Sequence, residues 1–257
     1  MHRSATISTV LLSFLPACYI QFDGAPEDNP NHVQEVRPQE DIVEVVNESS
    51  LDVRITTGQA TSTLTVWCTP EALPDIETRV QDGVLTVDVP NHVDVRGCSI
   101  DAAVGELSRV DTSGSGNLWV RGASQALVRV HASGSGDVFI GTLVTTDLTA
   151  RAEGSGDLTF RELTAASLDL TVEGSGCAEL AGEVPVLSID QTGSGDVDAE
   201  SLWSEDVTLS MMGSGDAEVT AATSVTADLF GSGDLTVFGQ PATRDIDTRG
   251  SGDVDFR

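Results

Sequence analysis

The chain contains no lysine, so its 13 basic residues are all arginine, and they face 41 acidic residues. The formal net charge is therefore −28 at pH 7. A field of this sign repels the phosphate backbone of nucleic acids and the anionic surface of membranes. The composition argues against nucleic acid as a partner and against docking on a membrane by charge.

Aromatic residues are scarce, at 4% of the chain, whereas glycine is abundant, with 25 residues. Valine, threonine, serine and aspartate recur along the whole sequence. This mixture is typical of many short strands joined by tight turns, and it argues against a helix bundle.

The N-terminal apolar run is too short to span a bilayer as a helix, which needs roughly 20 residues. Residues 1–17 have the make-up of an export signal, with Arg3 before an apolar segment and the small Ala17 at its end. Leu15-Pro16-Ala17-Cys18 resembles the lipobox of bacterial lipoproteins, in which the cysteine becomes the acylated first residue. Acyl chains on Cys18 would hold the protein on a membrane. The alternative is an ordinary signal peptide with Cys18 incidental.

We expect residues 18–41 to form a flexible tether, because prolines, asparagines and acids follow one another there without apolar periodicity. Tyr19, where an aspartate would retain some lipoproteins in the inner membrane, favours the outer membrane by resemblance to the sorting rules of some bacteria. The predicted location is thus the cell envelope, periplasmic or surface-exposed.

Four cysteines are present, namely Cys18, Cys68, Cys98 and Cys177. With Cys18 acylated, Cys68 and Cys98 are the natural disulfide pair in an oxidising compartment. The alternative is two separate thiols. Cys177 is then left over.

A repeat dominates the second part of the chain. The tripeptide Gly-Ser-Gly starts at positions 114, 134, 154, 174, 193, 213, 231 and 250, at intervals of 18 to 20 residues. A fixed period of this size indicates stacked structural repeats. We call the residue after each tripeptide the slot residue; the slot residues are Asn117, Asp137, Asp157, Cys177, Asp196, Asp216, Asp234 and Asp253.

Apolar residues alternate on both sides of each tripeptide, as in Leu158 and Phe160 after the slot or Leu148, Ala150 and Ala152 before the glycine. Alternation with period 2 predicts two strands per repeat with one face inward. A further apolar position recurs six residues after the slot, as at Leu143, Leu163 and Leu202. We predict an all-β fold, a right-handed parallel β-helix with rungs of about 20 residues over 108–257. Residues 42–107 form an N-terminal β part, packed on the solenoid or continuous with it.

The Gly-Ser-Gly-Asp repeats followed by alternating strands resemble the head GIN domain family of putative auto-transporter adhesins. Asp82-Gly83-Val84-Leu85-Thr86-Val87 also resembles the opening of that family. The resemblance covers residues 42–257 and implies an exported β-helical protein. Asn117 and Cys177 in slots, and Arg244 at an inward position, depart from the regular pattern.

The slot residues are predicted to cap the corners, since glycine permits positive φ and the Asp that follows can accept backbone N–H bonds in an Asx-like turn. The alternative is a ladder of bound calcium ions. One carboxylate per rung supplies too few ligands for calcium, so we predict no metal and no cofactor. Seven slot residues are assigned this capping role: Asn117, Asp137, Asp157, Asp196, Asp216, Asp234 and Asp253.

No catalytic residue is assigned. The repeated serines do not fit Gly-x-Ser-x-Gly, and the four histidines have no metal-ligand spacing. We therefore expect a protein that is not an enzyme and that presents a rigid β-helix for adhesion, ligand binding or envelope structure. The alternative is a carbohydrate-active β-helix enzyme acting on an extended polysaccharide.

One group of outward positions in the first rungs gathers arginine beside aromatic residues, a combination common in binding surfaces. We hypothesise that this group contacts an acidic polysaccharide or an envelope protein; the alternative is an ordinary surface under the N-terminal segment. Its members are Trp119, Arg121, Arg129, His131, Phe139, Arg151 and Arg161, next to Arg109.

The last rung is expected to carry charged guards against edge pairing, with end-to-end self-association as the alternative. The guards are Arg244, Arg249, Asp253, Asp255 and Arg257.

Overall fold

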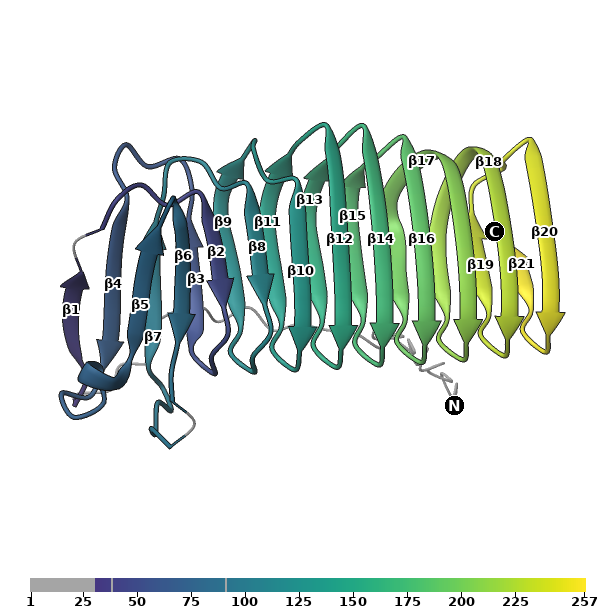
Figure 1. Cartoon of the computed structure of the whole chain (residues 1–257). Helices are drawn as coiled ribbons and strands as arrows, with labels where there is room; N and C mark the ends of the chain where they lie inside the picture. Colours follow the sequence, from purple (N-terminus) through teal and green to yellow (C-terminus); the bar gives the residue numbers. More distant parts are fainter. Residues whose placement is uncertain (1–30, 38, 91) are drawn as a thin grey trace, which may run out of the picture.

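The computed structural model describes residues 31–37, 39–90 and 92–257, and Figure 1 shows that they form a rod of stacked β-strands. The rod is a β-solenoid of about 7 turns with rungs about 20 residues apart. The predicted fold class is therefore confirmed. Among the described residues, no helix is long and apolar enough to cross a membrane.

Two parallel sheets run along the rod, and each rung gives one stretch of strand to each sheet. Sheet I contains β2 (Glu44–Asn47), β8 (Arg109–Thr112), β10 (Arg129–Gly134), β12 (Asp147–Gly154), β14 (Ser167–Gly174), β16 (Val186–Gly193) and β20 (Thr243–Gly250). Sheet II contains β3 (Asp52–Thr56), β9 (Leu118–Ser124), β11 (Val138–Val144), β13 (Leu158–Thr164), β15 (Ala178–Glu183), β19 (Leu235–Phe238) and β21 (Val254–Phe256). The long strands β17 (Val197–Gly213) and β18 (Ala217–Gly231) belong to sheet II in their first part and to sheet I in their second.

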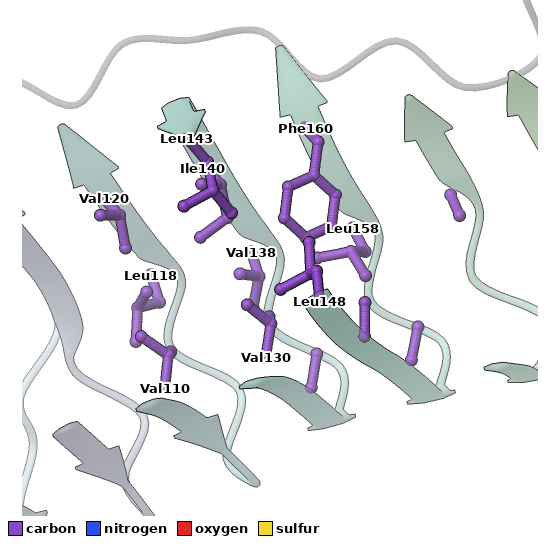
Figure 2. Close-up of a cluster of buried hydrophobic side chains, with 14 of the residues drawn as sticks. Val110, Leu118, Val120, Val130, Val138, Ile140, Leu143, Leu148, Leu158 and Phe160 are labelled. Carbon is purple, nitrogen blue, oxygen red and sulfur yellow. The ribbon is translucent and has the colours of Figure 1, made fainter. Parts of the chain in front are cut away.

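The core lies between the two sheets, as Figure 2 shows for the first rungs. Val110, Val130 and Leu148 point inward from sheet I toward Leu118 and Val138 of sheet II. All five are at most 2% exposed. Parallel pairing in register places equivalent side chains above one another, so each apolar position becomes a continuous column. The additional anchors predicted at Leu143, Leu163 and Leu202 are also buried.

Glycine is required at the corners mainly because successive corners touch. A Cβ on Gly154, whose φ is +109°, would lie 2.3 Å from the carbonyl oxygen of Gly134. A Cβ on Gly156 would lie 2.1 Å from the carbonyl oxygen of Gly136, although its φ is not positive. The sequence argument from positive φ thus holds for the first glycine of this corner, whereas the second is required by close backbone approach.

The N-terminal β part is continuous with the solenoid. After β1 (Val33–Arg37), the chain forms β2 and β3. Later in the chain, β6 (Val84–Asp88) pairs in parallel with β2, and β7 (Ser99–Ala103) pairs in parallel with β3, on the side away from the Gly-Ser-Gly rungs. The chain then returns to form β8 and β9, which pair with β2 and β3 on their other side, where the Gly-Ser-Gly rungs follow. β4 (Thr63–Cys68) and β5 (Glu77–Gln81) add antiparallel strands beyond β7 and β6, and the short 3-10 helix η1 (Leu73–Asp75) joins them.

The predicted tether over residues 18–41 is wrong in its last part, because β1 (Val33–Arg37) is a strand paired antiparallel with β4. Arg37 fixes this strand with hydrogen bonds from its guanidinium to the carbonyl oxygens of Leu73 and Ile76, at 3.0 and 2.6 Å. Four of the five residues of β1 are exposed. The strand therefore has no buried face, and its sequence lacks the alternation of apolar and polar residues that would predict a strand. Residues 18–30, with Cys18, lie outside the described residues.

The structure contains the predicted disulfide between Cys68 and Cys98. It joins the end of β4 to the residue before β7, two strands that are antiparallel neighbours. In the last rung, Arg244 is in register with buried Val225 but is itself exposed. Its guanidinium lies 4.0 Å from the ring centre of Phe256.

Candidate functional site

The slot residues form a ladder of hydrogen bonds between rungs. The side-chain oxygen of Asn117 accepts the backbone N–H of Asp137 at 2.9 Å, and that of Asp137 accepts the N–H of Asp157 at 3.0 Å. The predicted capping role needs correction, because the N–H belongs to the slot residue of the next rung and not to the same turn. Asp157, Asp196, Asp216 and Asp234 accept in the same way, and the N–H of Asp253 donates to Asp234.

The ladder has a member that sequence reasoning missed. Asp52 accepts the N–H of Asn117 at 2.9 Å, so the series begins in the rung of β2 and β3. That rung lacks Gly-Ser-Gly, and Ser49 and Leu51 stand at the glycine positions. The signal was present nevertheless, since Asp52-Val53-Arg54-Ile55 has the same alternation as Asn117-Leu118-Trp119-Val120.

The ladder places carboxylates in sequence along the rod without forming a metal centre. Burial raises the pKa of Asp157, the N–H bond from Cys177 lowers it, and the charge of Asp137 raises it further. Among the described residues, no group of three or more His, Cys, Asp or Glu side chains could hold a metal ion. The carboxylates of Asp137, Asp157, Asp196, Asp216 and Asp234 each accept the backbone N–H of the next rung, so the ladder helps to hold these rungs in register.

The predicted patch of arginine and aromatic residues is not one surface. Arg109, Arg129, His131 and Arg151 point outward from sheet I, because they alternate with buried Val110, Val130 and Ala150. Trp119, Arg121, Phe139 and Arg161 belong to sheet II, where Trp119 and Phe139 alternate with buried Leu118, Val120, Val138 and Ile140. The outward sides of the two sheets face in opposite directions, since their inward sides share the core. The hypothesis of a single patch is therefore wrong.

On sheet I, arginines, carboxylates and His131 form a connected series of close polar contacts. Arg109 Nε lies 2.5 Å from Asp111 Oδ2, and the ring of His131 lies between Asp111 Oδ1 at 3.4 Å and Glu153 Oε1 at 3.7 Å. Arg151 pairs with Glu153, and the hydrogen bond between them raises the pKa of Arg151. Arg151 also lies 2.9 Å from Glu173. Arg129 is exposed and forms no ion pair with any residue that the structure describes.

On sheet II, Trp119 lies in register between Arg54 and Phe139. Phe139 is only 7% exposed, so its outward register position does not make it an exposed aromatic residue. Arg54 is 6% exposed and donates from Nε to Asp101 Oδ1 at 2.6 Å. Trp67 donates from its indole N–H to the other oxygen of Asp101 at 2.8 Å.

Arg54, Asp101 and Trp67 were not singled out in the sequence, because they lie on strands far apart along the chain. Their bonds join β3, β7 and β4, so this group stabilises the N-terminal β part. The buried guanidinium of Arg54 is matched by a carboxylate, as the burial of a charge requires.

Two open hollows lie at the N-terminal end of the described chain. One, of about 600 Å³, is lined by Arg37, Leu64 and Thr78, among others; the second, of about 430 Å³, has His32 and His92 in its wall. Arg37 also donates to the hydroxyl of Thr78, so its guanidinium is bound to protein atoms on that side. None of the residues predicted for the patch lines either hollow.

Residues 43–241 match the model of the family described as "Putative auto-transporter adhesin, head GIN domain". Comparison with the curated proteins gave no match. A putative adhesin from Parabacteroides distasonis is similar in structure, with a TM-score of 0.80, 21% identity, and coverage of 88% of this chain and 97% of that one. A putative lipid binding protein from the same organism has a TM-score of 0.79 and 21% identity, with coverage of 89% of this chain and 98% of that one. A putative adhesin from Parabacteroides merdae has a TM-score of 0.76 and 20% identity, with coverage of 89% of this chain and 97% of that one. At these identities the likeness concerns the fold.

Proposed function

Since the chain belongs to the head GIN domain family of putative auto-transporter adhesins, we propose that it is a non-enzymatic binding protein of the bacterial cell envelope. It acts as a rigid rod that presents the outward faces of sheets I and II to an extended ligand. Adhesion or envelope structure is the biological outcome of that binding.

The observation that carries this proposal is the in-register stacking of the rungs. Inward positions and corners are occupied by residues that the packing requires, as at Leu158, Phe160 and Gly156. Outward positions carry no such requirement and differ from rung to rung, as in the register column of Arg129, Thr149 and Asp169. Solenoids use such long, regular flanks as binding surfaces.

The proposal includes an acyl anchor on Cys18, which would hold the rod on the outer membrane. The support is the Leu-Pro-Ala-Cys segment after a short apolar run. Two or more acyl chains give a stable anchor, because each buried methylene contributes about 0.8 kcal/mol. Changing Cys18→Ser should move the protein from the membrane fraction to the soluble fraction; an unchanged membrane fraction would remove the anchor from the proposal.

Binding itself is tested with the purified full-length protein on a panel of immobilised polysaccharides and envelope proteins. Retention and release of cleaved product are scored in the same wells. We expect retention on at least one ligand without cleavage. Cleavage would instead support the carbohydrate-active enzyme, and a protein retained by no ligand would contradict the proposed function.

A further inference from the structure

Positive charge on sheet I is concentrated in its first rungs. Arg109, Arg129, His131 and Arg151 stand on the adjacent strands β8, β10 and β12, and we call these four residues the arginine face. Residues 162–243, by contrast, contain 15 acidic residues and no Lys, Arg or His. An anionic ligand is therefore repelled along the middle of the rod, and on sheet I basic residues occur in the arginine face and, at the far end, on β20, where Arg249 is paired with Asp247.

Within the arginine face, Arg129 carries the charge that is not neutralised. It is in register with Arg109 on the neighbouring parallel strand, at a strand spacing of about 4.8 Å. Like charges in directly opposite positions destabilise a sheet. Arg109 is paired with Asp111, and Arg151 with Glu153 and Glu173, but Arg129 has no ion pair with a described residue. An anion beside Arg129 would relieve the repulsion from Arg109.

The neighbours of Arg129 can complete such a site. Thr149 is in register with it on β12 and supplies a hydroxyl, and His131 follows two residues along the same strand face. A guanidinium presents N–H donors in a planar fork that matches a carboxylate. The arginine face thus combines a bidentate cation with a hydroxyl donor on an open sheet.

The register column that contains Arg129 continues along the rod as a row of polar side chains. Beyond Thr149 it consists of Asp169, Ser188 and Thr208, one residue per rung. Hydroxyls and a carboxylate repeated at the strand spacing are suitable partners for the hydroxyl groups of sugars. Asp169 would repel a second acidic group, so the ligand needs its charge at the arginine end and neutral sugar beyond it.

We propose that the arginine face binds the carboxylate of an acidic polysaccharide, with Arg129 as the principal contact and the sugar chain lying across β10, β12 and β14. This inference rests on the proposed function and names its ligand class and its place. It assigns the contact to sheet I and leaves the arginines of sheet II outside the site.

The test measures binding of the hyaluronate disaccharide, in which one sugar carries a carboxylate and the other is neutral, to the full-length protein by titration calorimetry. Chitin oligomers of equal length serve as the uncharged probe. Arg129→Gln removes the proposed contact, and Arg161→Gln is the matched control. Arg161 is an exposed arginine of sheet II, so the two substitutions change the net charge equally.

We expect Arg129→Gln to weaken hyaluronate binding about tenfold or more, as for loss of a charge-assisted hydrogen bond. Arg161→Gln should change it less than twofold, and chitin oligomers should bind more weakly than hyaluronate to the wild type. Equal losses in both variants would mean that overall charge decides binding, and this would overturn the inference. It is also overturned by an unchanged affinity of Arg129→Gln or by a wild type that binds neither probe. The proposed function survives these results if the panel of ligands still retains the protein.

Discussion

At the scale of single residues, the corners require glycine because a Cβ there would clash with the backbone of the preceding rung. The first glycines of most corners have positive φ, and both glycines of each repeated corner have the backbone of the preceding rung against the place of a Cβ. The slot side chain next to them then bonds the N–H of the following rung. The Gly-Ser-Gly-Asp motif is therefore a device for contact between rungs and not only for turning the chain.

Changing Gly154→Ala should lower the free energy of unfolding by more than about 3 kcal/mol, because the new Cβ meets the backbone of Gly134 at 2.3 Å. Gly58→Ala is the matched control, since Gly58 has φ +79° but no atom within 4 Å of a Cβ. It should cost only about 1 kcal/mol. Urea unfolding measures the free energy of unfolding of both variants. Equal losses would show that positive φ alone, and not contact with the preceding rung, explains the requirement for glycine.

Changing Asp157→Asn should stabilise the protein at pH 7. Burial raises the pKa of Asp157 above its ordinary 3.8, so the stability linked to its proton is present below about pH 3.8 and is lost as pH rises through the folded pKa. Asparagine keeps an acceptor for the N–H of Cys177 and carries no charge, as Asn117 does in its own slot. Thermal unfolding at pH 7 and pH 3 tests this: the gain should appear at pH 7 and vanish at pH 3.

Asp157→Ala provides the control for that experiment. It removes the acceptor as well as the charge, and it should destabilise the protein at both pH values by about 1 to 2 kcal/mol. An asparagine variant that behaved like the alanine variant would mean that the ladder needs a carboxylate.

At the scale of strands, most rungs are divided into two strands and two rungs are not. β15 and β16 are separate strands, and Gly182 and Pro185 stand at and just beyond the end of β15. The next rung has neither glycine nor proline between Val197 and Met212, and there β17 continues through both sheets as one strand of 17 residues. β13 and β14 are separate strands although no glycine or proline stands between Leu158 and Glu173, so these residue types alone do not decide the division. The prediction of two strands per rung was correct for most rungs and wrong in β17 and β18.

Loss of the disulfide should destabilise the N-terminal β part. The bond closes a loop of sequence separation 30, for which the chain-entropy relation gives about 3 to 4 kcal/mol. The double change Cys68→Ala and Cys98→Ala should reduce the free energy of unfolding by that amount. A reducing agent should destabilise the wild type in a similar way and should have a smaller effect on the double variant. A wild type whose N-terminal strands are unaffected by reduction would contradict this prediction.

At the scale of the whole molecule, the negative charge is spread along a rod whose stability depends on contacts between neighbouring rungs. Fifteen acidic residues without a basic one occupy residues 162–243. Burial raises the pKa of Glu179 and Glu218, and the nearby charge of Asp198 raises the pKa of both further. The rod therefore holds together against its own charge through its core and its ladders.

Raising the salt concentration from about 0.01 M to 0.15 M should increase the melting temperature. The screening length falls from about 30 Å to about 8 Å over this range, so repulsion between carboxylates on different rungs weakens. Calorimetric scans at constant pH measure the change, and an equal osmolality of sucrose controls for general solvent effects. A melting temperature that falls with salt would mean that ion pairs such as Arg151–Glu173 outweigh the repulsion.

The sequence alone determined the repeat, the inward columns and the solenoid, because alternation with period 2 and a spacing of about 20 residues are local properties of the chain. It also indicated the Cys68–Cys98 pair, which the structure contains. Only the tertiary structure decided that Arg129 and Trp119 face opposite ways, that Asp52 begins the ladder, and that Arg54 is held by Asp101. These facts depend on how far the chain turns within a rung and on which distant strands become neighbours. Neither is encoded in the residues of one repeat.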